Sequence, residues 1–137
     1  MKKDVIQTIL PHREPMLLID ETELVDDTAI SKYTVRGDEF FLQGHFPGNP
    51  IVPGVILCEM MAQSACLLVK QNGGRLTPYL TGLKNVKFKG KVVPGDRLTF
   101  KCCKTAQKGS FYFIKGEGYV ENRLCVTGEL SFFTEQK

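Results

Sequence analysis

The feature that most constrains the fold is a helical stretch that is apolar on nearly every side. It begins at Pro53, a residue suited to the first position of a helix, and is expected to end near Asn72-Gly73-Gly74. Between residues 55 and 69 only three polar side chains interrupt the apolar run: Glu59, Gln63 and Ser64. A helix of this kind must be surrounded by protein, so the rest of the chain is expected to wrap around it.

Six strand-like segments flank this helix. Two precede it and four follow it, at residues 16–25, 28–36, 79–89, 96–107, 111–121 and 124–134. Alternation is clearest at residues 111–114 and 124–127, where odd- and even-numbered side chains are expected on opposite faces. A short amphipathic helix at residues 3–10 opens the chain, and Pro11 ends it. The economical solution is a single α+β domain over residues 1–137, in which a six-stranded antiparallel sheet curls around the long central helix, the hot-dog fold.

Composition argues against several classes of protein. The apolar run from Ile51 to Val69 contains Pro53 and Glu59 and falls short of the roughly 20 residues that span a bilayer, so no membrane partner is expected. Residues 1–10 form an amphipathic stretch without the apolar core of a signal peptide, so none is expected, and the five cysteines form an odd number without a C-x-x-C pair. These features predict reduced thiols, a cytoplasmic protein and no metal site. A net charge of +3 is too mild to indicate a nucleic-acid partner.

Two ionisable side chains stand in surroundings that suit catalysis. His45 lies in a Gly- and Pro-rich loop before the central helix, and Glu59 follows fourteen residues later inside that helix. The ordinary pKa of imidazole, about 6.5, suits a base near neutral pH. An apolar setting raises the pKa of a carboxyl group, so Glu59 is expected to be protonated and to act as an acid.

Other residues near this pair are assigned supporting roles. The free N–H of Gly54 at the helix N-terminus can stabilise a developing negative charge. Gln63, one turn beyond Glu59, can orient the carboxyl group. His12, the other histidine, is expected to cap the first helix or anchor its loop, and Cys58 is expected to pack in the core rather than act as a nucleophile.

The segments that carry these residues resemble a known family. They are HFPGNPIVPGV at residues 45–55, LCEMMAQ at 57–63, LPHREPMLLID at 10–20 and VKFKGKVVPGDRL at 86–98. In the same order, these are similar to the motifs of the (3R)-hydroxyacyl-[acyl carrier protein] dehydratases of the FabZ type. The resemblance covers nearly the whole chain and implies the hot-dog fold.

The resemblance also implies an activity and a set of site residues. It implies dehydration of a (3R)-3-hydroxyacyl thioester to the trans-2-enoyl thioester in fatty acid elongation, with His45 as base and Glu59 as acid. It implies no cofactor other than the phosphopantetheine arm that carries the substrate. The expected substrate-binding residues are Gly54, Val55, Gln63, Phe46 and Tyr79, the last as a gate over the acyl tunnel.

The expected partners are acyl carrier protein and further copies of the chain. The resemblance implies a homodimer in which His45 of one subunit faces Glu59 of the other, and three dimers in a hexamer. The sheet is expected to leave one side of the apolar helix uncovered, which predicts contact with the same helix of a second subunit. Because the carrier is acidic, a basic tunnel mouth is expected at Lys84, Lys87, Lys89, Lys91 and Arg97, with Lys87, Lys89 and Lys91 on the solvent side, opposite Val86 and Phe88.

Three other functions remain open for this fold. A hot-dog acyl thioesterase activates water with a helix carboxylate and needs no histidine at position 45. A non-catalytic module that binds acyl thioesters should lack the acid–base pair. A related dehydratase that also isomerises the double bond has aspartate at the position of Glu59, so the glutamate favours dehydration alone.

Overall fold

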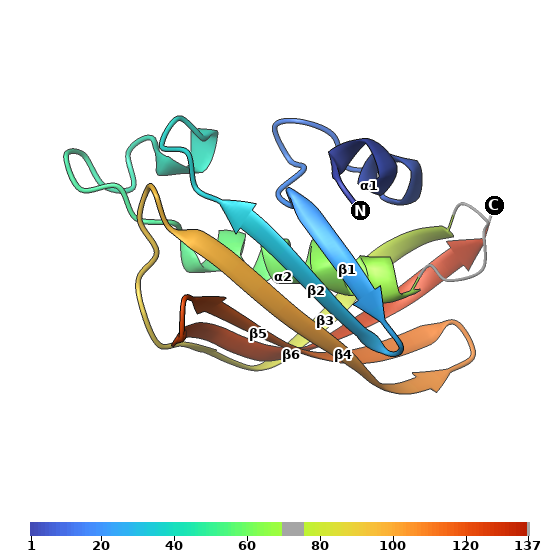
Figure 1. Cartoon of the computed structure of the whole chain (residues 1–137). Coiled ribbons are helices and arrows are strands. Elements are labelled where there is room, and N and C mark those ends of the chain that lie inside the picture. The colour runs from blue at the N-terminus through green and yellow to red at the C-terminus, as the bar shows by residue number, and fades with distance from the viewer. Residues whose placement is uncertain (70–75, 137) are drawn as a thin grey trace.

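A curved sheet that wraps around one long helix organises the molecule (Figure 1). The computed structural model describes residues 1–69 and 76–136. The elements, in chain order, are α1 (Lys3–Ile9), β1 (Glu21–Val25), β2 (Thr28–Thr34), the 3₁₀ helix η1 (Phe40–Leu42), α2 (Gly54–Val69), β3 (Leu76–Phe88), β4 (Arg97–Lys108), β5 (Phe111–Val120) and β6 (Arg123–Gln136). All neighbouring strands pair antiparallel in the order β1-β2-β4-β5-β6-β3, so β1 and β3 form the two edges. This is the expected hot-dog fold.

Helix α2 is enclosed on both sides within one chain. Every residue from Leu57 to Val69 is buried except Glu59, and Figure 1 shows α1 and the segment after it on the side of α2 away from the sheet. The expectation that one side of the helix stays uncovered is therefore wrong. The first turn is different, because Val55 is 75% exposed. The expected helix end at Asn72-Gly73-Gly74 lies outside the described residues.

The segment that covers α2 was expected to be the first half of a strand at residues 16–25, and that expectation is also wrong. Strand β1 begins only at Glu21. Leu17, Leu18 and Ile19 are all buried in succession, which strand alternation does not allow for a sheet with one covered face. The backbone here is bound by a helix side chain instead, because the N–H of Leu18 donates to Oε1 of Gln63 at 2.8 Å.

Strands β5 and β6 show where alternation holds and where it fails. In β5 it is confirmed, since Ile114 is buried whereas Phe111 and Phe113 are exposed. In β6 the expected alternation at residues 124–127 is wrong, because Cys125 and Val126 are both fully buried. The register steps from Gly118↔Val126 to Tyr119↔Leu124, so Cys125 is the extra residue of a β-bulge.

The packing of α2 on the sheet depends on a close approach at Gly116 of β5. A Cβ atom at this position would lie 2.6 Å from the side chain of Met61 on α2, so only glycine leaves room for the helix. Within the described part of the chain, none of the helices is long and apolar enough to cross a membrane.

Candidate active site

The loop that carries His45 is anchored at its start by a buried carboxylate. Glu39, which is 5% exposed, accepts hydrogen bonds from the hydroxyl of Tyr33 at 2.7 Å and from the N–H groups of Arg36 and Gly37 at 2.9 and 2.8 Å. The short helix η1 follows, and the N–H of His45 donates to the carbonyl of Leu42 at its end, at 3.3 Å. The position of His45 is thus tied to the sheet through Tyr33 of β2.

The imidazole of His45 is held in one orientation by the backbone of its own loop. Its Nδ1 lies 2.9 Å from the carbonyl oxygen of Ile51, and the N–H of Ile51 donates to the carbonyl of His45 at 2.9 Å. A carbonyl can only accept, so Nδ1 carries the hydrogen and Nε2 of the neutral ring keeps its lone pair. The ring also stacks on Phe46, with centroids 4.3 Å apart. Nε2 is therefore available as a base.

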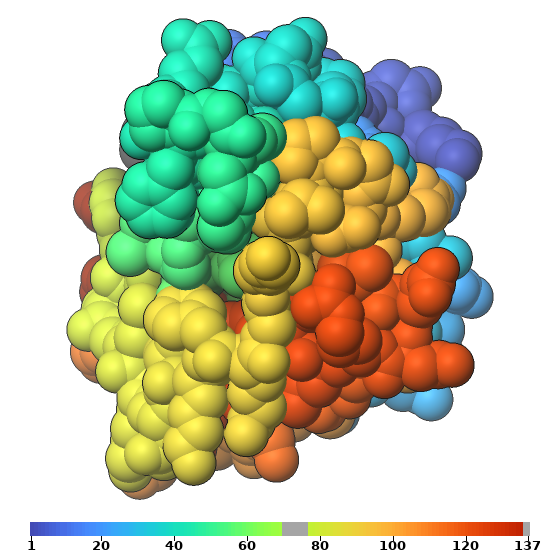
Figure 2. Space-filling view, turned by 90° about the vertical axis from the view of Figure 1, so that its left-hand side faces the viewer, coloured from blue at the N-terminus to red at the C-terminus, as the bar shows by residue number. Residues whose placement is uncertain are grey.

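His45 lines a cavity of about 550 Å³ at the N-terminus of α2. The other lining residues are Ile51, Val52, Gly54, Val55, Leu57, Phe88, Gly90 and Lys91. Figure 2 looks onto this face and shows the His45 loop, in green, beside the segment that follows β3, in yellow. The N–H of Val52 donates to the carbonyl of Val92 at 2.9 Å and joins these two segments. Two of the expected substrate-binding residues, Gly54 and Val55, thus lie in the same cavity as His45.

Phe88 lines this cavity, although alternation with the lysines beside it predicts a place on the buried face of the strand. It is 53% exposed, so that expectation is wrong. A Cβ atom at Gly54 would lie 2.9 Å from two carbons of the Phe88 ring, which places the ring directly against the start of α2. The signal that could have indicated this residue is its place in the fourth segment of the resemblance, VKFKGKVVPGDRL at residues 86–98.

Glu59 lies on α2 in a different environment, with two side chains as partners. Nε2 of Gln63 donates to its Oε2 at 2.9 Å, so Gln63 contacts Glu59 as expected. Nε2 of His12 lies 3.5 Å from the same oxygen, a contact that the sequence analysis missed. Of the two roles expected for His12, the cap belongs to Arg13, whose guanidinium donates to the carbonyls of Gln7 and Leu10 near the end of α1. The contact with Glu59 gives His12 the other role, an anchor of its loop.

The pKa of Glu59 moves in the direction opposite to the expected one. Burial raises the pKa of this carboxyl group, but the hydrogen bonds from His12 and Gln63 and the charge of His12 outweigh burial and lower it. The apolar neighbours in the helix sequence indicated only the first effect. Cys58, by contrast, is buried as expected, and burial raises the pKa of its thiol, which argues against a nucleophile.

Within one chain, the structure does not place Glu59 in the cavity of His45. Glu59 is not among the residues that line that cavity, and its carboxyl group contacts His12 and Gln63 instead. Tyr79 is also distant, since nine residues of β3 separate it from Phe88, or about 30 Å of extended chain. Its role as a gate stays a prediction. Across residues 1–69 and 76–136, no group of three or more His, Cys, Asp or Glu side chains could hold a metal ion.

The fold is that of a hot-dog domain, with His45 beside the N-terminus of α2 and Glu59 within α2. Residues 10–129 match the family model of the FabA-like domain, and the chain belongs to this family. It is 39% identical over 131 residues to the 3-hydroxyacyl-[acyl-carrier-protein] dehydratase FabZ of Streptococcus pyogenes serotype M5 (strain Manfredo), covering 93% of this chain and 94% of the relative. The enzyme of the same name from Clostridium perfringens (strain SM101 / Type A) is 37% identical over 135 residues, 96% of this chain and 97% of the relative.

A solved structure agrees in fold. The dehydratase heterocomplex ApeI:P from Xenorhabdus doucetiae superposes with a TM-score of 0.82 at 24% identity, covering 96% of this chain and 91% of the other. The sequence resemblance and the hot-dog fold are thereby confirmed.

Proposed function

We propose that this protein removes water from a (3R)-3-hydroxyacyl thioester carried by acyl carrier protein and forms the trans-2-enoyl thioester. The observation that carries this proposal is the fixed imidazole of His45, with Nε2 free, in a cavity at the N-terminus of α2. The similarity to FabZ dehydratases over nearly the full chain supports the same reaction.

Three residues carry out the proposed dehydration: His45, Gly54 and Glu59. Nε2 of His45 removes a proton from C2, and an N–H of the first turn of α2, that of Gly54, binds the thioester oxygen as negative charge develops there. Glu59 supplies a proton to the C3 hydroxyl group, which leaves as water. Because the reaction involves no net oxidation or reduction, we propose that it needs no cofactor beyond the phosphopantetheine arm of the carrier.

We propose that two copies of the chain complete each site, with His45 of one copy facing Glu59 of the other. Glu59 does not line the cavity of His45 in its own chain, which supports this arrangement. Strand β3 is a long edge strand with Leu80 and Leu83 exposed, so it can pair with the same strand of a second copy. In an antiparallel pair centred near Leu83, Tyr79 of the second copy would lie opposite Phe88 and could gate the cavity.

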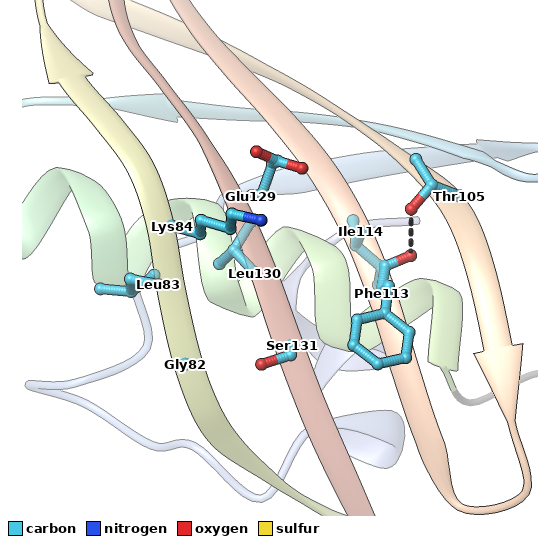
Figure 3. A pocket seen from close by; sticks show the side chains of 9 residues that line it. All are labelled: Gly82, Leu83, Lys84, Thr105, Phe113, Ile114, Glu129, Leu130 and Ser131. Carbon is cyan, nitrogen blue, oxygen red and sulfur yellow. Dashed lines mark hydrogen bonds between the residues drawn. The ribbon is translucent and has the colours of Figure 1, made fainter.

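We propose that the outer face of the sheet joins three such dimers in a hexamer. A hollow of about 250 Å³ lies there over β6, between β3 and β5. Figure 3 shows Phe113, Ser131 and Gly82 along one side of it. Cross-strand register places Tyr79, Phe133 and Phe111 in the adjoining row, and all three rings are exposed. An exposed aromatic patch of this kind is typical of an interface. Replacing Phe113 and Phe133 by Lys should leave dimers in sedimentation analysis, and an unchanged mass would contradict this interface.

The carrier is proposed to dock on the lysines beside the cavity. Lys87, Lys89 and Lys91 are exposed, and Lys91 lines the cavity itself. Arg97 lies at the β1 side, where it binds Glu21, so we base the docking surface on the lysines. We place the activity in the cytoplasm, and the five free cysteines support a reducing compartment.

Turnover of a carrier-bound 3-hydroxyacyl substrate tests the proposal. His45→Ala and Glu59→Gln should each lower kcat by roughly 10²–10⁴-fold while the circular dichroism spectrum is unchanged, since each removes a proton transfer. Glu23→Gln, an exposed carboxylate on β1, is the matched control. Release of free thiol would identify a thioesterase, binding without turnover would identify a binding module, and a 3-enoyl product would identify an isomerising dehydratase.

A subunit mixture tests the shared site. After exchange between His45→Ala and Glu59→Gln dimers, about half of the dimers are hybrid and each hybrid holds one intact site, so activity should return to about a quarter of the wild-type value. No recovery after verified exchange would show that each site lies within one chain.

A further inference from the structure

A second histidine lies at the carboxylate of Glu59. His12 belongs to the loop that follows α1, and this loop lies above α2 in Figure 1. Nε2 of His12 is 3.5 Å from Oε2 of Glu59, and the two side chains are only 24% and 30% exposed. Imidazole and carboxylate are thus close enough to exchange a proton, in a place that solvent reaches only in part.

The other nitrogen of the His12 ring has no such partner. Nδ1 is buried and has no hydrogen-bond partner among residues 1–69 and 76–136. A proton that enters or leaves this ring therefore does so at Nε2, on the side of Glu59. Imidazole is the side chain best suited to gain and lose a proton near neutral pH.

Glu59 needs such a neighbour because its own surroundings favour the ionised form. Nε2 of Gln63 donates both to Oε2 of Glu59, at 2.9 Å, and to the carbonyl of Met16, at 2.7 Å. Oε1 of Gln63 accepts from the N–H of Leu18, which fixes the amide with its donor toward the carboxylate. Together with His12 this lowers the pKa of Glu59 against the effect of burial. An ionised Glu59 has no proton to give to a leaving hydroxyl group.

We propose that His12 and Glu59 hold one proton between them, and that this is the proton that leaves with the C3 hydroxyl group. The inference rests on the proposed dehydration. His12 touches no reacting atom and acts through Glu59, so it is a positioning residue.

The proton balance of the step is complete. In the proposed step the shared proton starts on Nε2 of His12, which lies 3.5 Å from Oε2 of Glu59. When the acyl chain displaces water, the neutral pair becomes more favourable than the ion pair, and the proton moves to Oε2. Glu59 then protonates the hydroxyl group as the C3–O bond breaks, and the C2–H electron pair forms the double bond while His45 takes the C2 proton. His45 later releases that proton to solvent, and His12 takes one up.

The other ionisable side chains around the pair are occupied elsewhere or uncharged. Cys66 on α2 is buried, and burial followed by the charge of Glu59 raises the pKa of its thiol. Arg13 binds backbone carbonyls of α1 and its loop, and Lys3 binds Glu14 at 2.8 Å. The pH dependence of the acid is therefore expected to follow His12 and Glu59.

The decisive variant is His12→Gln, which keeps an N–H donor beside Glu59 but cannot carry a proton. Its kcat at pH 8 should fall by about 10–100-fold with little change in KM, which is less than the roughly 10²–10⁴-fold expected for loss of the acid itself, because Glu59 remains. The acid would then titrate as a carboxyl group alone, so the alkaline limb of the kcat profile should move to lower pH. Imidazole in the buffer should restore part of the activity of His12→Ala. Arg13→Gln, the matched control in the same loop, should lower stability and leave that limb in place.

A normal kcat with an unshifted alkaline limb in His12→Gln would overturn the proposal. So would a loss that is equal at every pH and is not relieved by imidazole, because that is the behaviour of a structural residue. If the His12 variants do not fold, nitrogen-15 NMR of the folded Glu59→Gln variant decides. The His12 ring should lose its proton at lower pH there than in the wild type, and an unchanged midpoint would overturn the proposal. The two proposals fail separately. If the His12 midpoint shifts in Glu59→Gln but the wild type does not dehydrate the substrate, the proposed function is refuted and the proton sharing is not.

Discussion

Replacing Glu39 by Gln should destabilise the protein by about 2–3 kcal/mol at neutral pH, because Glu39 anchors the His45 loop through three hydrogen bonds. Oε2 accepts from the hydroxyl of Tyr33 and the N–H of Arg36, and Oε1 accepts from the N–H of Gly37. Glutamine can keep its oxygen at the place of Oε2, facing Tyr33 and Arg36. Its NH₂ group then takes the place of Oε1 and faces the N–H of Gly37, which is also a donor. One charge-assisted bond, worth roughly 1.5–3 kcal/mol, is lost, and the other two become neutral and weaker.

The deficit of the Glu39→Gln variant should depend on pH. Burial raises the pKa of Glu39, but the bonds from Arg36, Tyr33 and Gly37 outweigh burial and lower it. A carboxyl group whose pKa is lower in the folded state stabilises the fold above its unfolded pKa, about 4.3, and this contribution is lost as the pH falls through the folded value. The wild type should therefore lose stability in acid, and the difference from the variant should shrink.

Urea unfolding followed by circular dichroism at pH 7 and near pH 3 measures both effects. Glu23→Gln, an exposed carboxylate on β1, is the control and should stay within about 0.5 kcal/mol of the wild type. A deficit below about 0.5 kcal/mol at pH 7, or one of the same size at both pH values, would refute the hydrogen-bonded carboxylate as the anchor of the loop.

Three further changes test the site. Gly54→Ala should cost about 1–3 kcal/mol because its Cβ would lie 2.9 Å from the Phe88 ring, and Phe88→Ala should relieve part of that cost in the double variant, so strictly additive losses would contradict the contact. Lys87→Glu combined with Lys89→Glu should raise KM for a carrier-bound substrate, less so at high salt, while turnover of a short pantetheine thioester stays the same; equal effects on both substrates would place the carrier elsewhere. Glu59→Asp should keep part of the activity in the same assay, since the acid remains but retreats by about one carbon–carbon bond, and complete loss would argue against an acid at this position.

The architecture could be predicted because it depends on patterns between near neighbours in the chain. A helix that is apolar on nearly every side must be enclosed, and strands at regular spacing supply the enclosure. The same holds for β5, where Phe113 and Ile114 lie on opposite faces as the alternation predicts. The Gly- and Pro-rich loop likewise placed His45 beside the helix start, since Gly54 is only nine residues away.

Where the prediction failed, contacts with residues far away in the sequence decided the local structure. Residues 16–20 are not a strand because Gln63, more than forty residues later, binds their backbone. Cys125 is buried although the alternation predicts the opposite face, because the register between β5 and β6 shifts by one residue. Such a shift depends on both strands and cannot be read from either sequence alone.

The sequence by itself determined the helix and the sheet, and it indicated His45 and Glu59 as the candidate base and acid. Only the tertiary structure decided the direction in which the pKa of Glu59 shifts. The neighbours of Glu59 in the sequence are apolar and predict a raised pKa, but His12, which is 47 residues earlier, lies 3.5 Å away in space and reverses the direction. Apolar periodicity is a property of residues close together in the sequence. Electrostatic energy depends on the distance between charges, and that distance is set only when the chain has folded.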